Sequence, residues 1–473
     1  MNDKKKIFLN SAAVFTATIM DNALFFILNI IIARYLSIDS FGEYTTALGY
    51  ATFFATMTDI GINAALQRMV SREPESARYH FGNVITIKTL LALLAYGAMS
   101  VSLLFTNYSS NIIYLTLIMG LFRMGNEYHS TFYSLFDAQE KFLFSSFVRS
   151  SFGIMVLAGS IAVILMNGDI FDLAWVRCAV VAVYALFLVF FSIRALRPKV
   201  NRKTYITFIR TALPFGASSI INNFYQRLNL IILSLIHGSV YTGVFTNGYM
   251  FFTTLFFIPG NFSRVLLPYL YRVDFRKDKD KFQFAFDFYS KYLAIAGFYC
   301  MIIIILFSHA IILLLFGTKY DQSKWVLRIS ALGIPFIFTI GSTIIAALDR
   351  QHDVTKIQCI GLIFNIPANL LLIYYFKSEG AAIASVLTYA LINWLYMVFL
   401  ARQGFISIRN HHICFIKLSV ISLLCLLLWY FDMRHRSLIL AVSSVSALFI
   451  IPTIALLIRR DDLRIFRDIF LRK

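Results

Sequence analysis

Charged residues are scarce in this sequence of 473 residues: Asp, Glu, Lys and Arg make up 14% of it, whereas 59% of the residues are hydrophobic. A soluble chain carries about a quarter charged residues, so the composition excludes an ordinary water-soluble protein. Acidic residues are the rarer kind, with 24 Asp and Glu against 43 Lys and Arg. The composition therefore predicts an all-α polytopic membrane protein.

Cysteine pairs and catalytic motifs are also missing. The five cysteines have no C-x-x-C spacing, which argues against both a disulfide framework and a zinc site. The sequence lacks G-x-x-x-x-G-K-[ST], G-x-S-x-G and H-E-x-x-H, and its predicted external loops are too short for a membrane-embedded glycan polymerase or ligase. We therefore expect a protein that is not an enzyme, with no catalytic residue, no metal and no cofactor.

Long apolar runs dominate what is present. About 20 apolar residues are needed to cross the hydrocarbon core as a helix. The first run continues to Leu36, too far for a signal peptide, so we expect a retained first helix. Fourteen runs qualify, at 10–36, 41–66, 80–105, 111–136, 143–166, 171–194, 210–236, 242–266, 288–316, 326–349, 354–376, 380–402, 414–431 and 437–458.

The basic residues support this topology. With the N-terminus in the cytoplasm, 32 of the 43 Lys and Arg fall in cytoplasmic segments, 7 in external loops and 4 inside spans. This bias follows the positive-inside rule. It places the C-terminus in the cytoplasm as well, and it explains the basic tail without a nucleic-acid partner.

Two stretches repeat along the chain. The template Ser-Thr-x5-Asp-x-Gln ends the fourth span at 130–139 and the tenth at 342–351, and a Gly-x-aromatic-Thr pattern followed by Gly-Tyr opens the second and eighth spans. Parallel repeats of this kind are a known transporter plan. We predict two six-helix lobes in the same orientation, at 1–200 and 201–405, followed by two extra helices and a basic tail at 406–473.

One intramembrane arginine lies in a polar setting. Arg227 falls near the middle of the run 210–236, where a charge costs about 2.5–3.5 kcal/mol and normally faces a cavity or a partner. Four amides share one side of this helix, with Arg227 at its edge: Asn222, Asn223, Gln226 and Asn229. Such a stripe suits sugar hydroxyls or a diphosphate, and an interhelical hydrogen-bond seam is the alternative.

Three further bases lie inside spans. Arg123 and Glu127 are four residues apart and are expected to pair, either in the substrate path or as a structural ion pair. Lys88 either serves the path or snorkels to the interface. Arg177, near the outer end of its span, fits an interfacial position or the cavity. Because a guanidinium suits phosphate oxygens, we expect Arg123 and Arg227 to face each other as clamps from opposite lobes.

Two acids lie alone in apolar surroundings. Asp21 is in the first span, and Asp59 is near the cytoplasmic end of the second. Burial favours the protonated form of a carboxyl group, so either residue is a candidate for ion coupling. For Asp59, a pairing with a basic residue for folding is the alternative.

The stretch ARYLSIDSFGEYTTALGYATFFATMTDIGINAALQRMVSRE resembles the opening of the polysaccharide-biosynthesis flippases of the multidrug/oligosaccharidyl-lipid/polysaccharide exporter superfamily. LPFGASSIINNFYQRLNLIILSLIHGSVYTGVF, LFGTKYDQSKWVLRISALGIPF and EGAAIASVLTYAL are similar to later parts of that family, so the resemblance covers most of residues 1–400. In the opening stretch the matching positions are Ala33, Arg34, Leu36, Gly42, Tyr44, Asp59, Gly61 and Arg68.

The resemblance implies two six-helix lobes around a central cavity, with the last two helices outside. It also implies a flippase in the bacterial inner membrane that moves a polyprenyl-diphosphate-linked oligosaccharide, of the O-antigen (lipopolysaccharide) or capsule type, to the outer leaflet. Membrane lipid, the polysaccharide polymerase and the chain-length machinery are the other expected partners. The alternatives are a cation-coupled multidrug exporter of the same superfamily, which would gain nothing from Arg227, and a non-transporting scaffold, which would not explain buried charge.

Overall fold

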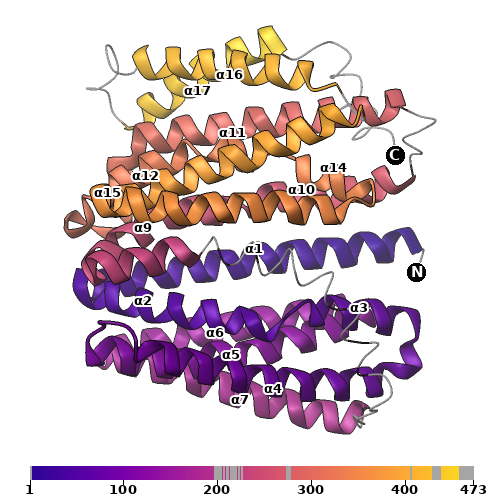
Figure 1. Cartoon of the computed structure of the whole chain (residues 1–473), viewed down its shortest axis with the longest axis vertical. Helices are drawn as coiled ribbons and strands as arrows, with labels where there is room; N and C mark the ends of the chain where they lie inside the picture. The colour runs from indigo at the N-terminus through magenta and orange to yellow at the C-terminus, as the bar shows by residue number, and fades with distance from the viewer. Residues whose placement is uncertain are drawn as a thin grey trace. The chain divides into compact units, whose positions relative to one another are not determined.

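A computed structural model describes residues 3–196, 227–272, 279–404, 407–428 and 438–457, together with Tyr205, Phe208, Ala212, Ile221 and Phe224. Every regular element within these ranges is a helix, and none is a strand, as the sequence predicts (Figure 1). The first part of the chain forms α1 (Asp3–Tyr35), α2 (Ile38–Ala55), α3 (Ile62–Arg72), α4 (Ala77–Leu103), α5 (Ser110–Ala138), α6 (Phe142–Leu165) and α7 (Ile170–Leu196).

The second part begins with the described helix Arg227–His237. After it come α9 (Ser239–Leu255), α10 (Phe257–Arg272), α11 (Lys279–Phe316), α12 (Ser323–Ala331), α13 (Ile334–Ile337), α14 (Gly341–Ala347), α15 (Gln351–Arg402), α16 (Arg409–Leu428) and α17 (Leu438–Leu457). The short 3₁₀ helices η1 (Thr56–Thr58), η2 (Pro74–Ser76) and η4 (Thr318–Tyr320) lie in the connections.

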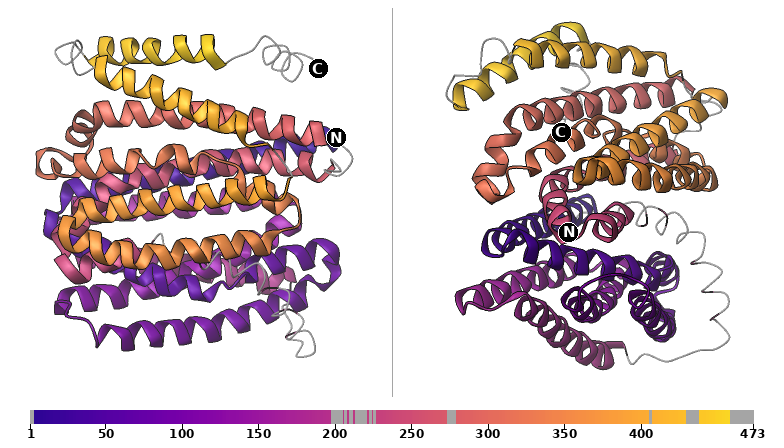
Figure 2. Two further views of the ribbon diagram at one scale, coloured as in Figure 1. Left: turned by 45° about the horizontal axis from the view of Figure 1, so that its top comes forward. Right: turned by 60° about the vertical axis from the view of Figure 1, so that its left-hand side comes forward.

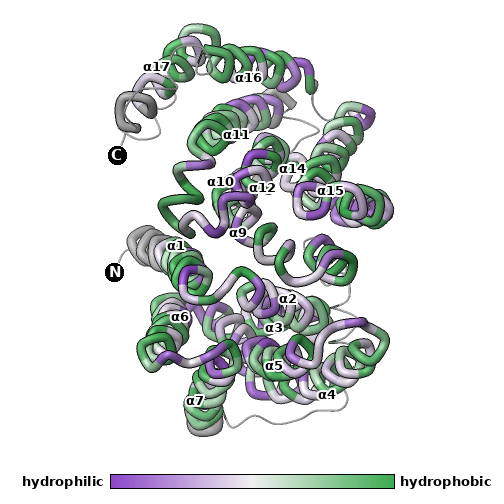
Figure 3. Tube along the Cα trace, turned by 90° about the vertical axis from the view of Figure 1, so that its left-hand side faces the viewer, coloured by the Kyte–Doolittle hydropathy of each residue, from purple (hydrophilic) through white to green (hydrophobic). Residues whose placement is uncertain are grey.

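Several helices are long and apolar enough to cross a membrane. Seven described helices meet this requirement, or eight when the bent pair α12 and α13–α14 counts as one span. Hydrophobic residues extend along α6, α7 and α16 (Figure 3), and side chains such as Leu93 and Leu94 are more than 60% exposed, as lipid-facing residues are. The protein is therefore a multi-pass membrane protein, and the count of fourteen spans stays a prediction.

α15 contains two of the predicted spans. Its 52 residues would extend about 78 Å, more than twice the hydrocarbon thickness. The helix is interrupted at Lys377, where φ is 51° and ψ is −125°, outside the helical region. This interruption falls between the predicted spans 354–376 and 380–402.

Three predicted spans are broken in the structure. The run 41–66 divides between α2 and α3, because Gly61 adopts a left-handed φ of 73°. The run 242–266 divides at Phe256, between α9 and α10. The run 326–349 divides into α12, α13 and α14 with a bend of 46°, and Pro335 stands at the start of α13, where its missing N–H is not needed. In each case hydropathy alone predicts one uninterrupted helix.

The contacts divide the chain into two compact units. Unit 1 comprises residues 1–250, 315–320 and 358–384, and unit 2 comprises 251–314, 321–357 and 385–473. In unit 2, α16 and α17 lie beside α11 (Figure 2). The Asn410 amide donates to Asp287 at 2.8 Å, and the Tyr299 and Ser446 hydroxyl oxygens are 2.8 Å apart. The lobe boundaries 1–200 and 201–405 stay a prediction.

In unit 1, the two copies of the Gly-x-aromatic-Thr repeat meet each other. Gly243 of α9 lies against the backbone of Gly42 in α2, and a side chain on Gly42 would overlap the carbonyl of Ser239. The Ser239 hydroxyl also donates a hydrogen bond to Asp39. Equivalent residues of a duplicated unit touch where a twofold axis passes, so this crossing is what parallel repeats require.

The predicted external end of α1 is held within the same unit. Lys319 Nζ donates to the carbonyl oxygens of Arg34 at 2.9 Å and Leu36 at 2.6 Å. In return, Arg34 Nε donates to the Leu315 carbonyl oxygen at 2.7 Å. A lysine at a helix C-terminus satisfies carbonyls that have no partner within the helix.

Replacing Gly42 by Leu is expected to separate α2 from α9, because the added side chain has no room beside Ser239. The measurement is oxidative cross-linking of Asp39→Cys with Ser239→Cys, in a chain whose five natural cysteines are replaced by Ser. The parent pair should cross-link readily, and Gly42→Leu should lower the yield severalfold. Each single-cysteine chain is the control, and an unchanged yield would contradict the crossing.

Candidate functional site

A buried lysine in unit 1 connects residues of three segments. Lys88 of α4 is 1% exposed, so it does not snorkel to the interface. Its Nζ donates to the Glu127 carbonyl oxygen on α5 at 3.0 Å and lies 3.7 Å from Asp59 Oδ1. A buried ammonium is stable only when it is paired and hydrogen-bonded, and Lys88 meets both conditions.

Asp59 connects this lysine to the break in the second predicted span. Its Oδ1 accepts a bond from the Asn63 backbone N–H at 2.9 Å, and its Oδ2 accepts one from the Asn63 amide at 2.9 Å. The same amide donates to the Ser130 hydroxyl on α5 at 2.8 Å. Asp59 therefore caps α3 as well as pairing with Lys88, and the predicted alternative of a folding pair describes its position.

The predicted pair on α5 is present. Arg123 Nη2 lies 3.8 Å from Glu127 Oε1, and the two side chains are 21% and 16% exposed. Arg123 is also within electrostatic range of Arg177 on α7 and of Arg227. Arg123, Arg177 and Arg227, three of the four intramembrane bases, thus lie near one another.

Arg177 is fully enclosed. It is 3% exposed, so its side chain is enclosed by the protein. Its guanidinium carbon lies 5.2 Å from the ring centre of Tyr44 on α2 and 5.5 Å from that of Phe122 on α5. Aromatic faces attract a cation, so these rings stabilise its charge in part.

The polar stripe around Arg227 is described only in part. Arg227 is partly buried at the start of the helix Arg227–His237, whereas Asn222, Asn223 and Gln226 lie outside the described residues. Asn229 is 1% exposed, and its Oδ1 accepts a bond from the Asn369 amide at 2.8 Å. At Asn229 the structure has the interhelical hydrogen bond that was the alternative to cavity lining.

The other candidate for ion coupling also has a basic partner. Asp21 Oδ2 on α1 lies 3.7 Å from Arg149 Nε on α6, and both side chains are about one-third exposed. Its second oxygen, Oδ1, is buried and makes no hydrogen bond. Asp21 is therefore half satisfied, unlike Asp59.

Sequence patterns missed the partners that come from other helices. Tyr44, Phe122 and Arg149 each contact a predicted residue across a helix interface, whereas Asn63 contacts Asp59 within the same segment. Asn63 follows Asp59 by four residues, and capping propensity could have identified it. The others become visible only when the helices are packed.

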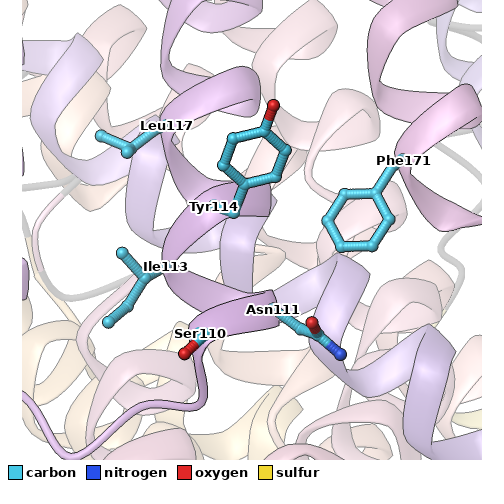
Figure 4. Close-up of a pocket in the computed structure, with 6 residues that line it drawn as sticks. All are labelled: Ser110, Asn111, Ile113, Tyr114, Leu117 and Phe171. Carbon is cyan, nitrogen blue, oxygen red and sulfur yellow. The ribbon is translucent and has the colours of Figure 1, made fainter.

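The pocket in Figure 4 lies away from these charges. It has a volume of about 460 Å³ and is formed by the first turns of α5 and α7. Its lining residues are Ser110, Asn111, Ile113, Tyr114, Leu117 and Phe171, and the rings of Tyr114 and Phe171 lie next to each other (Figure 4). None of the predicted site residues lines it. Within the described part of the chain, no group of three His, Cys, Asp or Glu side chains could hold a metal ion.

The Lys88–Asp59 pair yields a test of stability. Lys88 is 1% exposed and Asp59 is 28% exposed, so removing Asp59 leaves a buried ammonium without its counter-charge, at a cost of up to about 3–5 kcal/mol. Asp59→Asn should therefore lower the unfolding temperature more than the double variant Asp59→Asn/Lys88→Met does. Thermal unfolding of the purified full-length protein measures this.

The control is an exposed ion pair. Arg350 lies 3.2 Å from Asp353 and is 47% exposed, so Arg350→Gln should cost only about 0–1 kcal/mol. Additive effects of Asp59→Asn and Lys88→Met would contradict the coupling.

Comparisons with known proteins place this arrangement in a family. The profile of the polysaccharide biosynthesis protein family matches residues 7–273, more than half of the chain. A 99-residue segment is 34% identical to an uncharacterized membrane protein of Methanocaldococcus jannaschii. That match covers 20% of this chain and 19% of the relative, so the chain spans about a fifth of the curated relative's length.

Solved structures share the fold. The chain is similar to the lipid II flippase MurJ in an inward closed conformation, with a TM-score of 0.77, 16% identity, and coverage of 95% of this chain and 98% of that one. It is also similar to an inward-facing multidrug resistance MATE family transporter of the MOP superfamily, with a TM-score of 0.65, 12% identity, and coverage of 81% and 94%. The chain is a multi-pass membrane protein with the MurJ and MATE fold, and it belongs to the polysaccharide biosynthesis protein family.

Proposed function

We propose that this protein is a flippase that moves a polyprenyl-diphosphate-linked oligosaccharide of the O-antigen or capsule type from the cytoplasmic to the outer leaflet of the bacterial inner membrane. The observation that carries the proposal is an excess of cations among the apolar helices of unit 1. Lys88 and Arg123 have carboxylate partners there, whereas Arg177 and Arg227 form no ion pair with a described residue. Fixed positive charge in an apolar environment suits an anionic headgroup.

The chemistry of a diphosphate explains why arginines are used. A diphosphate crosses the membrane only when fixed groups replace its lost hydration, and a guanidinium presents a planar fork that matches phosphate oxygens. Arg123 and Arg227 are close enough to repel each other. An anion between them relieves that repulsion, so we assign these two residues to the clamp on the diphosphate.

The direction from which the substrate would enter is inferred from the helix contact that closes one end of unit 1. The contact of Gly42 with Gly243 joins α2 to α9 at their first turns, on the predicted external side. In this conformation the headgroup would enter from the cytoplasmic side, with its lipid tail left in the bilayer. Separation of α2 from α9 would then open the outer side, which is alternating access between the predicted lobes. Similarity to a structure named as a lipid II flippase supports a lipid substrate.

The test measures which leaflet holds the lipid-linked repeat unit. Cells without the protein should trap it on the cytoplasmic leaflet, and the wild-type chain should release it. Arg227→Ala and Arg123→Ala should each lower outward flux about tenfold or more, because hydrogen bonds to a charged group are lost. Arg→Lys at either position should recover part of the flux, since the charge returns without the fork.

Arg78→Ala is the matched control, because Arg78 is an exposed arginine of the same unit. Its flux should equal that of the wild type. Absence of trapping, with polymer still reaching the surface, would exclude the flippase. Full activity of Arg123→Ala and Arg227→Ala in a chain that does flip would exclude the clamp alone.

A cation-coupled multidrug exporter is the second candidate. The MATE fold and the half-satisfied carboxylate of Asp21 favour it. The unpaired arginines of unit 1 count against it, because a neutral or cationic drug gains nothing from them. Loss of drug resistance on deletion, with normal glycan export, would support the exporter.

Ion coupling through Asp21 or Asp59 is part of both candidates. If Asp21 carries a coupled proton, Asp21→Asn should abolish the dependence of flux on the pH gradient. Arg149→Gln is the matched control: it removes the same ion pair but keeps the carboxylate, so the dependence should persist. Equal behaviour of the two variants would assign Asp21 a purely structural role.

A further inference from the structure

The enclosed guanidinium of Arg177 has one edge without acceptors. Its Nε and Nη2 atoms are buried and make no hydrogen bond, although the side chain is only 3% exposed. These two nitrogens carry the parallel N–H groups of the guanidinium fork, the edge that grips an anion side-on. Nearly all buried polar groups are hydrogen-bonded, so two empty donors on one edge call for an explanation.

A third donor belongs to the same place. Tyr44 is 0% exposed, and its hydroxyl is also buried without a hydrogen bond. The Tyr44 ring lies 5.2 Å from the Arg177 guanidinium carbon, and the helices that carry the two residues, α2 and α7, pack together. Arg177 and Tyr44, on two adjacent helices, thus contribute three buried donors to which no described residue contributes an acceptor.

Charge leads to the same conclusion. Glu127 pairs with Arg123, and Arg177 forms no ion pair with a described carboxylate. The charge of Arg177 also lies within range of Arg123, which has the same sign. Rings of Tyr44 and Phe122 attract the cation through their faces, but they are weak acceptors for N–H groups.

We infer that the Arg177 fork and the Tyr44 hydroxyl bind a small inorganic anion of the chloride class. The occupant is small because Arg177 and Tyr44 are both enclosed, whereas an oligosaccharide diphosphate needs an open path. The site is therefore distinct from the proposed clamp of Arg123 and Arg227, although the charge of Arg177 also belongs to the cation excess on which the proposed function rests. A bound anion neutralises Arg177 and reduces the positive potential at Arg123, so anion occupancy tunes how strongly Arg123 attracts a negative group.

The test is thermal unfolding of the purified full-length protein in detergent, titrated from sodium gluconate to sodium chloride at constant sodium and ionic strength. A ligand that binds only the folded state raises the unfolding temperature in a saturable way. The wild type should show this rise. Arg177→Gln should show none, and Tyr44→Phe should raise the half-saturating chloride concentration about tenfold, because one hydrogen bond to an anion is lost.

Arg78→Gln is the matched control, since Arg78 lies over the Tyr79 ring at 4.5 Å but is exposed. It should respond to chloride as the wild type does. If Arg177→Gln does not fold, Tyr44→Phe still tests the inference, because this variant retains the ring and removes only the hydroxyl. In bromide-soaked crystals, an anomalous peak beside Nε and Nη2 would locate the ion.

Three results would overturn the inference. One is a wild type that unfolds at the same temperature in chloride and gluconate, and another is an equal chloride response in Arg177→Gln. The third is stabilisation by inorganic phosphate but not by chloride, which would mean that the position is open to a larger oxyanion. Each of these outcomes leaves the leaflet experiment on Arg123 and Arg227 unaffected, so the two proposals fail independently.

Discussion

The cost of a charge inside apolar helices is the constraint on which unit 1 depends. A charged side chain in hydrocarbon must find a partner or an aqueous cavity. Lys88 finds Asp59 and the Glu127 carbonyl, and these contacts join α4, α5 and the break before α3. The break itself supplies Asp59, because an uninterrupted helix would not leave its carboxylate free to cap Asn63. The irregular backbone and the buried lysine therefore require each other.

Helix positions follow closely from the sequence, whereas breaks and partners do not. The predicted run 143–166 corresponds to α6, Phe142–Leu165, because a span is a local property of about 20 residues. The division of the run 41–66 depends on the left-handed φ of Gly61, and a hydropathy pattern contains no information about this backbone angle. The pairing of Asp21 with Arg149 joins α1 to α6 and has no local signature. Local composition thus predicts the helices, and packing decides what their polar groups contact.

The candidate site divides in the same way. The spacing of Arg123 and Glu127 is enough to predict their pair, since both lie on one face of one helix. The enclosure of Arg177 could not be predicted, because Tyr44 and Phe122 come from two other helices. The sequence of a single helix shows only how far along its span Arg177 lies. That position does not reveal whether the side chain faces the membrane interface or is enclosed by aromatic rings from other helices.

The helices that end in the two copies of the Ser-Thr-x5-Asp-x-Gln repeat differ in two respects: one contains a charged pair, and the other contains a bend. Aligned on this repeat, Arg123 corresponds to Pro335 and Glu127 to Thr339. The first copy ends α5, a continuous helix of 29 residues that an i,i+4 ion pair supports. The second copy ends α14, after a bend of 46° that begins beside Pro335. A proline cannot occupy a helix interior without a break, and an ion pair is of little use across one. The copy that holds the charged pair is therefore the straight one, and the copy without it is the bent one.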